Sequence, residues 1–208
     1  MMKKPFGLLA LAFGLCALPA TSLASSVGWE FATLDNEHTP ASWDFGEVFT
    51  VNQNIFVDFL GYYLPSTGMT ASHEVALYDS LGNQLAHTVI TSGSSFATDH
   101  FLFNTIAPIE LFAGQTYVLQ GLSSTDPFAW DNSGFQTYAP ITILGNNAVN
   151  LNTLSFNGTN LVNDTDDGYW GANFGWDPVA AIPEPGSWTL AGTGLLLVAG
   201  TLRRKKKR

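Results

Sequence analysis

Short apolar segments and turn residues alternate along the middle of this chain, and this rhythm constrains the fold more than any other feature. Strand-like runs are separated by clusters of Gly, Pro, Asn and Ser about every 8–12 residues. No stretch of this region sustains the apolar repeat of about 3.6 residues that an amphipathic helix needs. The pattern predicts an all-β domain, an antiparallel β-sandwich of the jelly-roll kind.

Two hairpins are the clearest local predictions from this alternation. The run 74–79 is followed by a turn at Gly82, and the run 84–91 returns along it. A second turn at Gly114 precedes a run over 116–121. The two segments that flank each turn should therefore form neighbouring antiparallel strands.

Other segments carry weaker signals. Alternation over 55–64 places Ile55, Val57, Phe59 and Gly61 on one face of a predicted strand. Residues 157–176 are rich in Gly, Asn and Asp, and we expect them to be mostly loop. The remaining predicted strands cover 27–31, 47–51, 100–106, 108–112, 138–144 and 151–156.

The charges of the chain are segregated. All 8 Lys and Arg residues lie at positions 3, 4 and 203–208, whereas 17 Asp and Glu residues are spread along the chain. Nucleic-acid binding depends on Lys and Arg that neutralise phosphate, so we expect no nucleic-acid partner. An acidic surface of this kind suits divalent cations and neutral polysaccharide, or serves only to keep an exported protein soluble.

The first 24 residues have the form of a signal peptide. Two lysines precede the apolar run 6–18, and Ser22-Leu23-Ala24 is a small-x-small cleavage site before Ser25. We expect this segment to form the signal helix and to be removed. The chain has a single cysteine, Cys16, which lies inside the signal, so a core rather than disulfides must stabilise the mature domain.

The C-terminal residues 182–208 form a tail of three parts. The triplet Pro183-Glu184-Pro185 precedes an apolar segment, 188–202, which we expect to be a transmembrane helix. The positive-inside rule places the basic end in the cytoplasm and residues 25–181, the predicted sandwich domain, outside the inner membrane. The basic end consists of Arg203, Arg204, Lys205, Lys206, Lys207 and Arg208.

In this order and at this end of the chain, the three parts are similar to the PEP-CTERM sorting tail of Gram-negative surface proteins. The resemblance implies that an exosortase, a membrane-embedded transpeptidase-like protease, recognises the tail and removes it. It also implies an exported precursor that is anchored transiently in the inner membrane and then reaches the cell surface or the extracellular matrix. A simple tail anchor without processing is the alternative.

A second resemblance covers about a third of the chain, from residue 56 to residue 122. A hairpin of the form Tyr-Asp-x-x-Gly-x-x-Leu-Ala runs from Tyr78 to Ala86, and an Ala-Gly-x-x-Tyr turn runs from Ala113 to Tyr117. These features resemble a β-sandwich module that is common in bacterial exported proteins, including many with PEP-CTERM tails. The resemblance implies the sandwich fold and no particular activity.

The densest acidic cluster lies between Asn163 and Gly168. Asp164, Asp166 and Asp167 are candidate ligands for a structural calcium ion, because a hard cation needs several oxygen ligands at one point. The cluster resembles only part of a calcium loop, since no Glu stands where an EF-hand would end. A calcium site and a plain solvated loop both remain open, and we expect no other cofactor.

Aromatic residues crowd the second half of the chain. Tyr169, Trp170 and Trp176 lie in the Gly-rich stretch and are the aromatic residues that we expect to be exposed. Exposed rings among Asn and Asp side chains are typical of carbohydrate-binding surfaces, whereas buried rings would fill the core of a charge-poor sandwich. Extracellular polysaccharide is therefore a candidate partner.

The sequence contains none of the common catalytic motifs. It has no Gly-x-Ser-x-Gly elbow, no His-Glu-x-x-His pair, no phosphate-binding loop and no cysteine outside the signal. We therefore expect a non-catalytic, structural or adhesive protein of the cell envelope or polysaccharide matrix. The alternatives are a carbohydrate-binding module and, less favoured, an enzyme that acts on matrix polysaccharide.

Overall fold

The structure, a computed structural model, describes residues 26–34, 36–129, 135–150, 152–160 and 171–176. Two five-stranded antiparallel sheets make up most of this part of the chain, together with two small two-stranded ladders. The predicted all-β, antiparallel class is therefore confirmed. The described ranges contain no helix that is long and apolar enough to cross a membrane. The predicted signal and tail helices fall outside these ranges.

The first sheet contains both the first and the last described strands, which pair with each other at one edge. Every pairing in this sheet is antiparallel. Its order is β1 (Ser26–Val27), β14 (Ala172–Trp176), β5 (Ile55–Tyr63), β9 (Phe101–Leu111) and β8 (Phe96–Ala97).

The second sheet contains the predicted hairpin around Gly82 as its last two strands, and that prediction is confirmed. Its order is β13 (Ile141–Val149), β4 (Asp44–Val51), β10 (Thr116–Leu122), β6 (His73–Asp79) and β7 (Gln84–Ile90). The short ladders pair β3 (Glu37–His38) with β11 (Phe128–Ala129), and β2 (Trp29–Phe31) with β12 (Phe135–Thr137).

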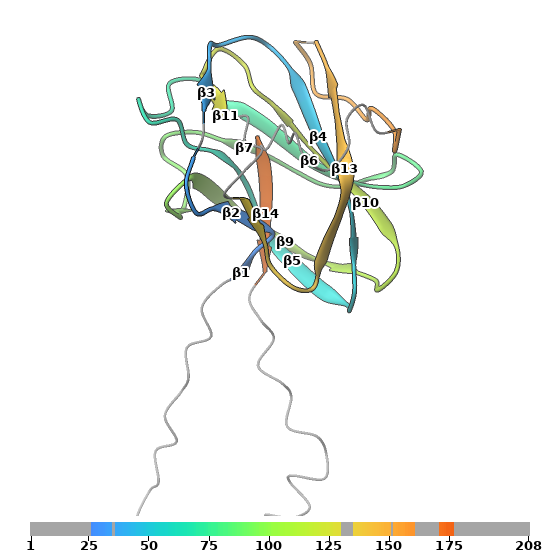
Figure 1. Cartoon of the computed structure of the whole chain (residues 1–208). Coiled ribbons are helices and arrows are strands. Elements are labelled where there is room, and N and C mark those ends of the chain that lie inside the picture. The colour runs from blue at the N-terminus through green and yellow to red at the C-terminus, as the bar shows by residue number, and fades with distance from the viewer. Residues whose placement is uncertain (1–25, 35, 130–134, 151, 161–170, 177–208) are drawn as a thin grey trace, which may run out of the picture.

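The two sheets pack on each other, as Figure 1 shows. The core between them is rich in aromatic side chains. Trp29 lies edge-on to Phe174 at a centroid distance of 5.5 Å, and Phe49 stacks on Phe174 at 4.9 Å. These contacts join β2, β4 and β14, so they connect the two sheets directly. Burial of each such side chain contributes on the order of 2–3 kcal/mol, which gives a fold without disulfides its stability.

The predicted turn at Gly114 is also confirmed, but it connects strands of different sheets rather than neighbouring strands. Strand β9 ends at Leu111 in the first sheet, and β10 begins at Thr116 in the second. The prediction that they pair is wrong, because β10 lies between β4 and β6. The turn is thus an arch that closes one end of the sandwich.

The predicted facing of β5 is wrong in its second half. Ile55 and Val57 share the face that lies in the core, but the next core residues of the strand are Leu60 and Tyr62, not Phe59. The ladder to β9 shifts register between Val57 and Phe59, which reverses the alternation.

Strand β9 was predicted as two strands and is one. Pro108 lies within it, opposite the register shift in β5, and β8 pairs only with its beginning, at Leu102 and Phe103. Proline lacks a backbone N–H, and it is tolerated in a strand at such an irregularity or at a free edge. Both conditions hold at Pro108.

Two further predictions fail in the second half of the chain. Residues 152–156 form no strand; instead, Leu154 and Phe156 pack over the outer face of the second sheet, against a small cluster formed by Val48, Ala76, Tyr78 and Val118. Residues 172–176 form β14 rather than a loop. This strand pairs with β1 on one side and with β5 on the other. Its own sequence alternates only weakly, so the strand was not predicted.

The chain enters and leaves the sandwich at the same end. Ser26 in β1 pairs directly with Trp176 in β14, and Figure 1 shows the two strands side by side at the bottom of the molecule. We call this end the exit pole; its turns are residues 52–54, 112–115 and 138–140, which hydrogen bonds connect to one another. The β6–β7 turn, residues 80–83, adjoins residues 112–115 along a shared groove, and we count it with this pole. The opposite end, the far pole, includes residues 64–72 and 123–127.

Candidate functional site

A groove of about 430 Å³ opens at the exit pole, between the β6–β7 hairpin and the β9–β10 arch. Leu85, Ile109 and Tyr117 form its apolar walls, and the first two also pack against the core. Leu81 and Phe112 stand at its rim. The groove therefore continues the apolar interior outward at the edge where the two sheets separate.

Leu81 protrudes because the turn that carries it is held by its own hydrogen bonds. The carboxylate of Asp79 accepts bonds from the backbone N–H of Leu81 and of Asn83, both at 2.9 Å, and from the Asn83 side chain at 2.7 Å. The bonds from Asn83 are the main reason why the pKa of Asp79 is lowered. The rigid turn leaves the Leu81 side chain 84% exposed.

Phe112 is presented by the arch in a similar way. Its backbone N–H donates to the buried hydroxyl oxygen of Tyr117 at 2.8 Å, and the next N–H, of Ala113, donates to the Asn54 side chain at 2.9 Å. The N–H of Gly114 donates to the carbonyl oxygen of Val51 at 2.8 Å. These bonds fix the arch to the β4–β5 turn while the Phe112 ring remains 53% exposed.

Exposed apolar side chains are concentrated at this pole. Among the described residues, seven large apolar side chains are exposed, and four of them belong to the exit pole. Phe56 lies near the start of β5, and Tyr138 precedes β13, where its N–H donates to the carbonyl oxygen of Gly28 at 3.2 Å. The four are Phe56, Leu81, Phe112 and Tyr138.

The far pole contains a different arrangement, a buried network centred on Asp126. Its carboxylate accepts hydrogen bonds from the backbone N–H groups of Thr70 and Ala71, at 2.8 and 2.9 Å, and from the Thr70 hydroxyl. His73 Nε2 lies 3.0 Å from it, and the His73 ring stacks on Tyr62 at 4.2 Å. Burial raises the pKa of Asp126, but these bonds outweigh burial and lower it to about 2.

A second buried carboxyl, Asp44, lies at the start of β4. It accepts bonds from the N–H and the hydroxyl of Ser155, at 2.8 and 3.1 Å, and from the Gln120 side chain at 3.2 Å. Here burial outweighs the hydrogen bonds and raises the pKa to about 6. Asp44 thus holds the segment around Ser155 against the second sheet.

A third carboxyl, Glu47, faces the interior between the sheets. It is 1% exposed, it pairs in register with Leu119 and Asn146, and its carboxyl oxygens have no hydrogen-bond partner among the described residues. Burial raises the pKa of this group well above its usual value. Both Asp126 and Glu47 are thus enclosed in the sandwich and are not presented to a substrate in solution.

The structure does not describe most of the predicted site residues. The candidate calcium ligands Asp164, Asp166 and Asp167, the aromatic residues Tyr169 and Trp170, the Pro183–Pro185 triplet and the basic end 203–208 all lie outside the described residues. Within the described ranges, no group of three or more His, Cys, Asp and Glu side chains is arranged to hold a metal ion.

Trp176 is the exception, and its predicted exposure is wrong. It is 6% exposed, in strand β14, and its ring lies 5.8 Å from that of Phe174. A ring covered by the core has no free face for a sugar to stack on, so the carbohydrate-binding hypothesis now depends on Tyr169 and Trp170.

The groove and its rim were not predicted from the sequence, although a signal for them exists. Leu81 and Phe112 are large apolar residues beside the turn glycines Gly82 and Gly114, where polar residues are usual. An apolar residue at a turn tip is therefore a sign of an interaction surface. The buried carboxyl networks have no comparable local signal, because Asp126 and Thr70 are 56 residues apart.

Comparison with known proteins adds a family but no activity. A family model described as Domain of unknown function (DUF4082) matches residues 30–170. No curated protein matches the chain.

Proposed function

The chain belongs to the DUF4082 family, and on that premise we propose that it is a surface-sorted, non-catalytic β-sandwich protein of the cell envelope or extracellular polysaccharide matrix. Its role is structural or adhesive. An exosortase processes its C-terminal tail, so the inner-membrane form is a precursor. The family match covers residues 30–170, so the expected signal and the C-terminal tail both lie outside it.

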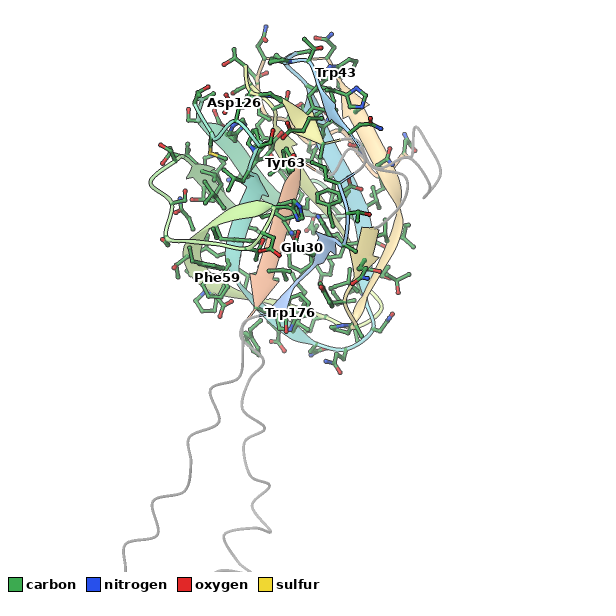
Figure 2. The ribbon with its side chains drawn as sticks, turned by 60° about the vertical axis from the view of Figure 1, so that its left-hand side comes forward. Glu30, Trp43, Phe59, Tyr63, Asp126 and Trp176 are labelled. Atoms are coloured by element: carbon green, nitrogen blue, oxygen red, sulfur yellow. The ribbon has the colours of Figure 1, made fainter. Side chains whose placement is uncertain are left out.

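The observation that carries this proposal is the pairing of β1 with β14. It brings the residue next to the expected signal cleavage site, Ser26, opposite Trp176, which precedes the tail. Because both ends leave the same end of the domain, the N-terminal signal and the C-terminal tail can both reach one membrane. Neither connecting segment has to run along the length of the sandwich. The pairing also leaves the far pole directed away from the attachment point, as Figure 2 shows for Asp126 and Trp176.

The intact mass of the exported protein tests the proposal. In a Gram-negative host with an exosortase, we expect a chain that begins near Ser25 and ends near Pro183–Pro185. Replacement of the triplet by alanines, with 188–202 unchanged, should retain the full tail and leave the protein in the inner membrane.

Recovery of the unaltered protein with Arg203–Arg208 still attached would contradict exosortase processing. It would leave a tail-anchored protein whose partners are to be sought in the periplasm. The host without its exosortase is the matched control, because it should give the same full-length mass as the triplet variant.

A further inference from the structure

We infer that the exit pole docks on a zwitterionic lipid surface, with Leu81 and Phe112 inserted between the headgroups and the acyl chains. This inference rests on the proposed function, because the membrane concerned is the one in which the C-terminal tail is embedded. The groove and its rim would contact lipid only in the precursor, before the tail is removed.

The length of the connecting segment limits how far the domain can move from the bilayer. Eleven residues, 177–187, separate Trp176 from the apolar run that begins at Trp188. Even a fully extended segment of this length spans at most about 40 Å. The exit pole is thus kept at a high effective concentration near the lipid surface, so weak apolar contacts suffice for docking.

The side chains at this pole are suited to that surface. Leu81 and Phe112 protrude on rigid turns, so their insertion requires little ordering of the chain. Phe56 and Tyr138 are exposed at the same end, and a tyrosine ring is favoured at headgroup level. By contrast, Val149 is exposed at the end of β13 that lies away from this pole.

Charge selects the kind of lipid. Asp79 and Glu110 lie beside the groove, and the chain has no Lys or Arg between residues 5 and 202 to offset them. Anionic headgroups would therefore repel this pole, whereas the ammonium group of phosphatidylethanolamine can pair with the two carboxylates. A second copy of the chain is disfavoured as the occupant, because it would bring the same carboxylates together.

The test uses residues 25–208, the form expected after signal cleavage, in vesicles of phosphatidylethanolamine and phosphatidylcholine. This form contains no cysteine, so Leu81→Cys provides a single site for an environment-sensitive fluorophore. Val149→Cys is the matched control, because Val149 is also exposed but lies at the opposite end of the molecule. Both proteins must first float with the vesicles, which measures tail insertion independently of docking.

We expect a blue-shifted emission at position 81 and a quenching by spin-labelled lipid at least threefold greater than at position 149. Phe112→Ser should weaken the signal at position 81 without changing the circular dichroism spectrum. Replacing half of the phosphatidylcholine by phosphatidylglycerol should also weaken it. These changes would distinguish docking of the pole from simple tethering of the domain.

Equal signals at positions 81 and 149 in protein that floats would overturn the inference and leave the proposed function intact. A shift at position 81 that depends on protein concentration and not on lipid would assign the pole to a second copy instead. Failure to float, in both labelled proteins and in the unlabelled chain, would refute the tail anchor and the inference together.

Discussion

The two poles of the sandwich differ in how deeply their polar groups are buried. At the far pole, buried carboxyls join segments that are distant in the sequence, as Asp126 does for the segment at Thr70 and for His73. At the exit pole, the Asp79 carboxylate bonds only within its own turn, and the adjacent apolar tips Leu81 and Phe112 are exposed. The carboxyls of the far pole are buried and stabilise the fold, whereas the hydrogen bonds of the exit pole lie near the surface beside exposed apolar side chains.

This difference separates the residues that stabilise the fold from those that can contact a partner. A buried polar group that loses its partner costs far more than an exposed apolar group that is made polar. Substitutions at the far pole should therefore unfold the protein, and those at the exit pole should change what it touches.

The largest effect is expected from Asp126→Ala. It leaves the backbone N–H groups of Thr70 and Ala71 and the buried His73 ring without their hydrogen-bond partner, so the free energy of unfolding should fall by about 3 kcal/mol. The control, Asp79→Ala, removes a carboxylate from an exposed turn and should cost much less stability than Asp126→Ala. Urea unfolding followed by circular dichroism measures both, and equal losses would remove the contrast between the poles.

Acid should act on the same network. Because the pKa of Asp126 is lowered to about 2 in the folded state, the stability that it contributes is complete above about pH 4 and is lost as the pH falls toward 2. Asp126→Asn should remove this part of the acid dependence. An unchanged pH profile between 4 and 2 in this variant would show that other carboxyls cause the loss.

Glu47 sharpens the comparison, because it is a buried carboxyl without the partners that Asp126 has among the described residues. Its pKa is raised, so its contribution is complete below about pH 4.5 and declines as the pH rises toward the folded-state value. Glu47→Gln should therefore gain stability relative to the unaltered chain as the pH rises from 5 to 8, because the amide cannot ionise. Thermal unfolding at pH 5 and pH 8 tests this; a stability difference that is the same at both would contradict it.

A smaller effect is expected at the turn glycines of the exit pole. Gly82 and Gly114 both have positive φ, +87° and +76°, so alanine at either position should cost about 1 kcal/mol. A Cβ at Gly82 would also lie 2.7 Å from the Phe156 ring, whereas a Cβ at Gly114 would meet no atom within 4 Å. Gly82→Ala should thus be the more destabilising, and the reverse order in urea unfolding would contradict the packing described here.

The smallest effect is expected at the groove rim. Leu81→Ser and Phe112→Ser change side chains that are mostly in water, so each should alter the free energy of unfolding by no more than about 0.5 kcal/mol. Ile109→Ser is the contrasting variant, because Ile109 lines the same groove but packs against the core. A large loss of stability in the rim variants would show that Leu81 and Phe112 stabilise the core and do not form a free contact surface.

Sequence reasoning succeeded where the determinants are local. The turns at Gly82 and Gly114 follow from turn chemistry and are found as predicted. The facing of β5 was missed because the register shift depends on β9, about 50 residues away, and on its Pro108. Strand β14 and the burial of Trp176 were missed because the pairing partners, rather than the sequence of the strand, determine its structure.

For the candidate site, the same distinction holds. Leu81 and Phe112 have a local signature, an apolar residue beside a turn glycine, and they could have been found. The contact between Asp44 and Ser155 spans 111 residues and has no signature in either segment. Only the folded arrangement shows that these two polar residues stabilise each other.

The pairing of Ser26 with Trp176 also has a mechanical consequence. When force is applied to both ends of the domain, adjacent antiparallel strands that begin and end at one edge are peeled apart one hydrogen bond at a time. In a sandwich pulled from opposite ends, many such bonds would resist together in shear. Force applied to the two ends of the domain would therefore meet little initial resistance. Strand β1 would separate from β14 before the force could unfold the core.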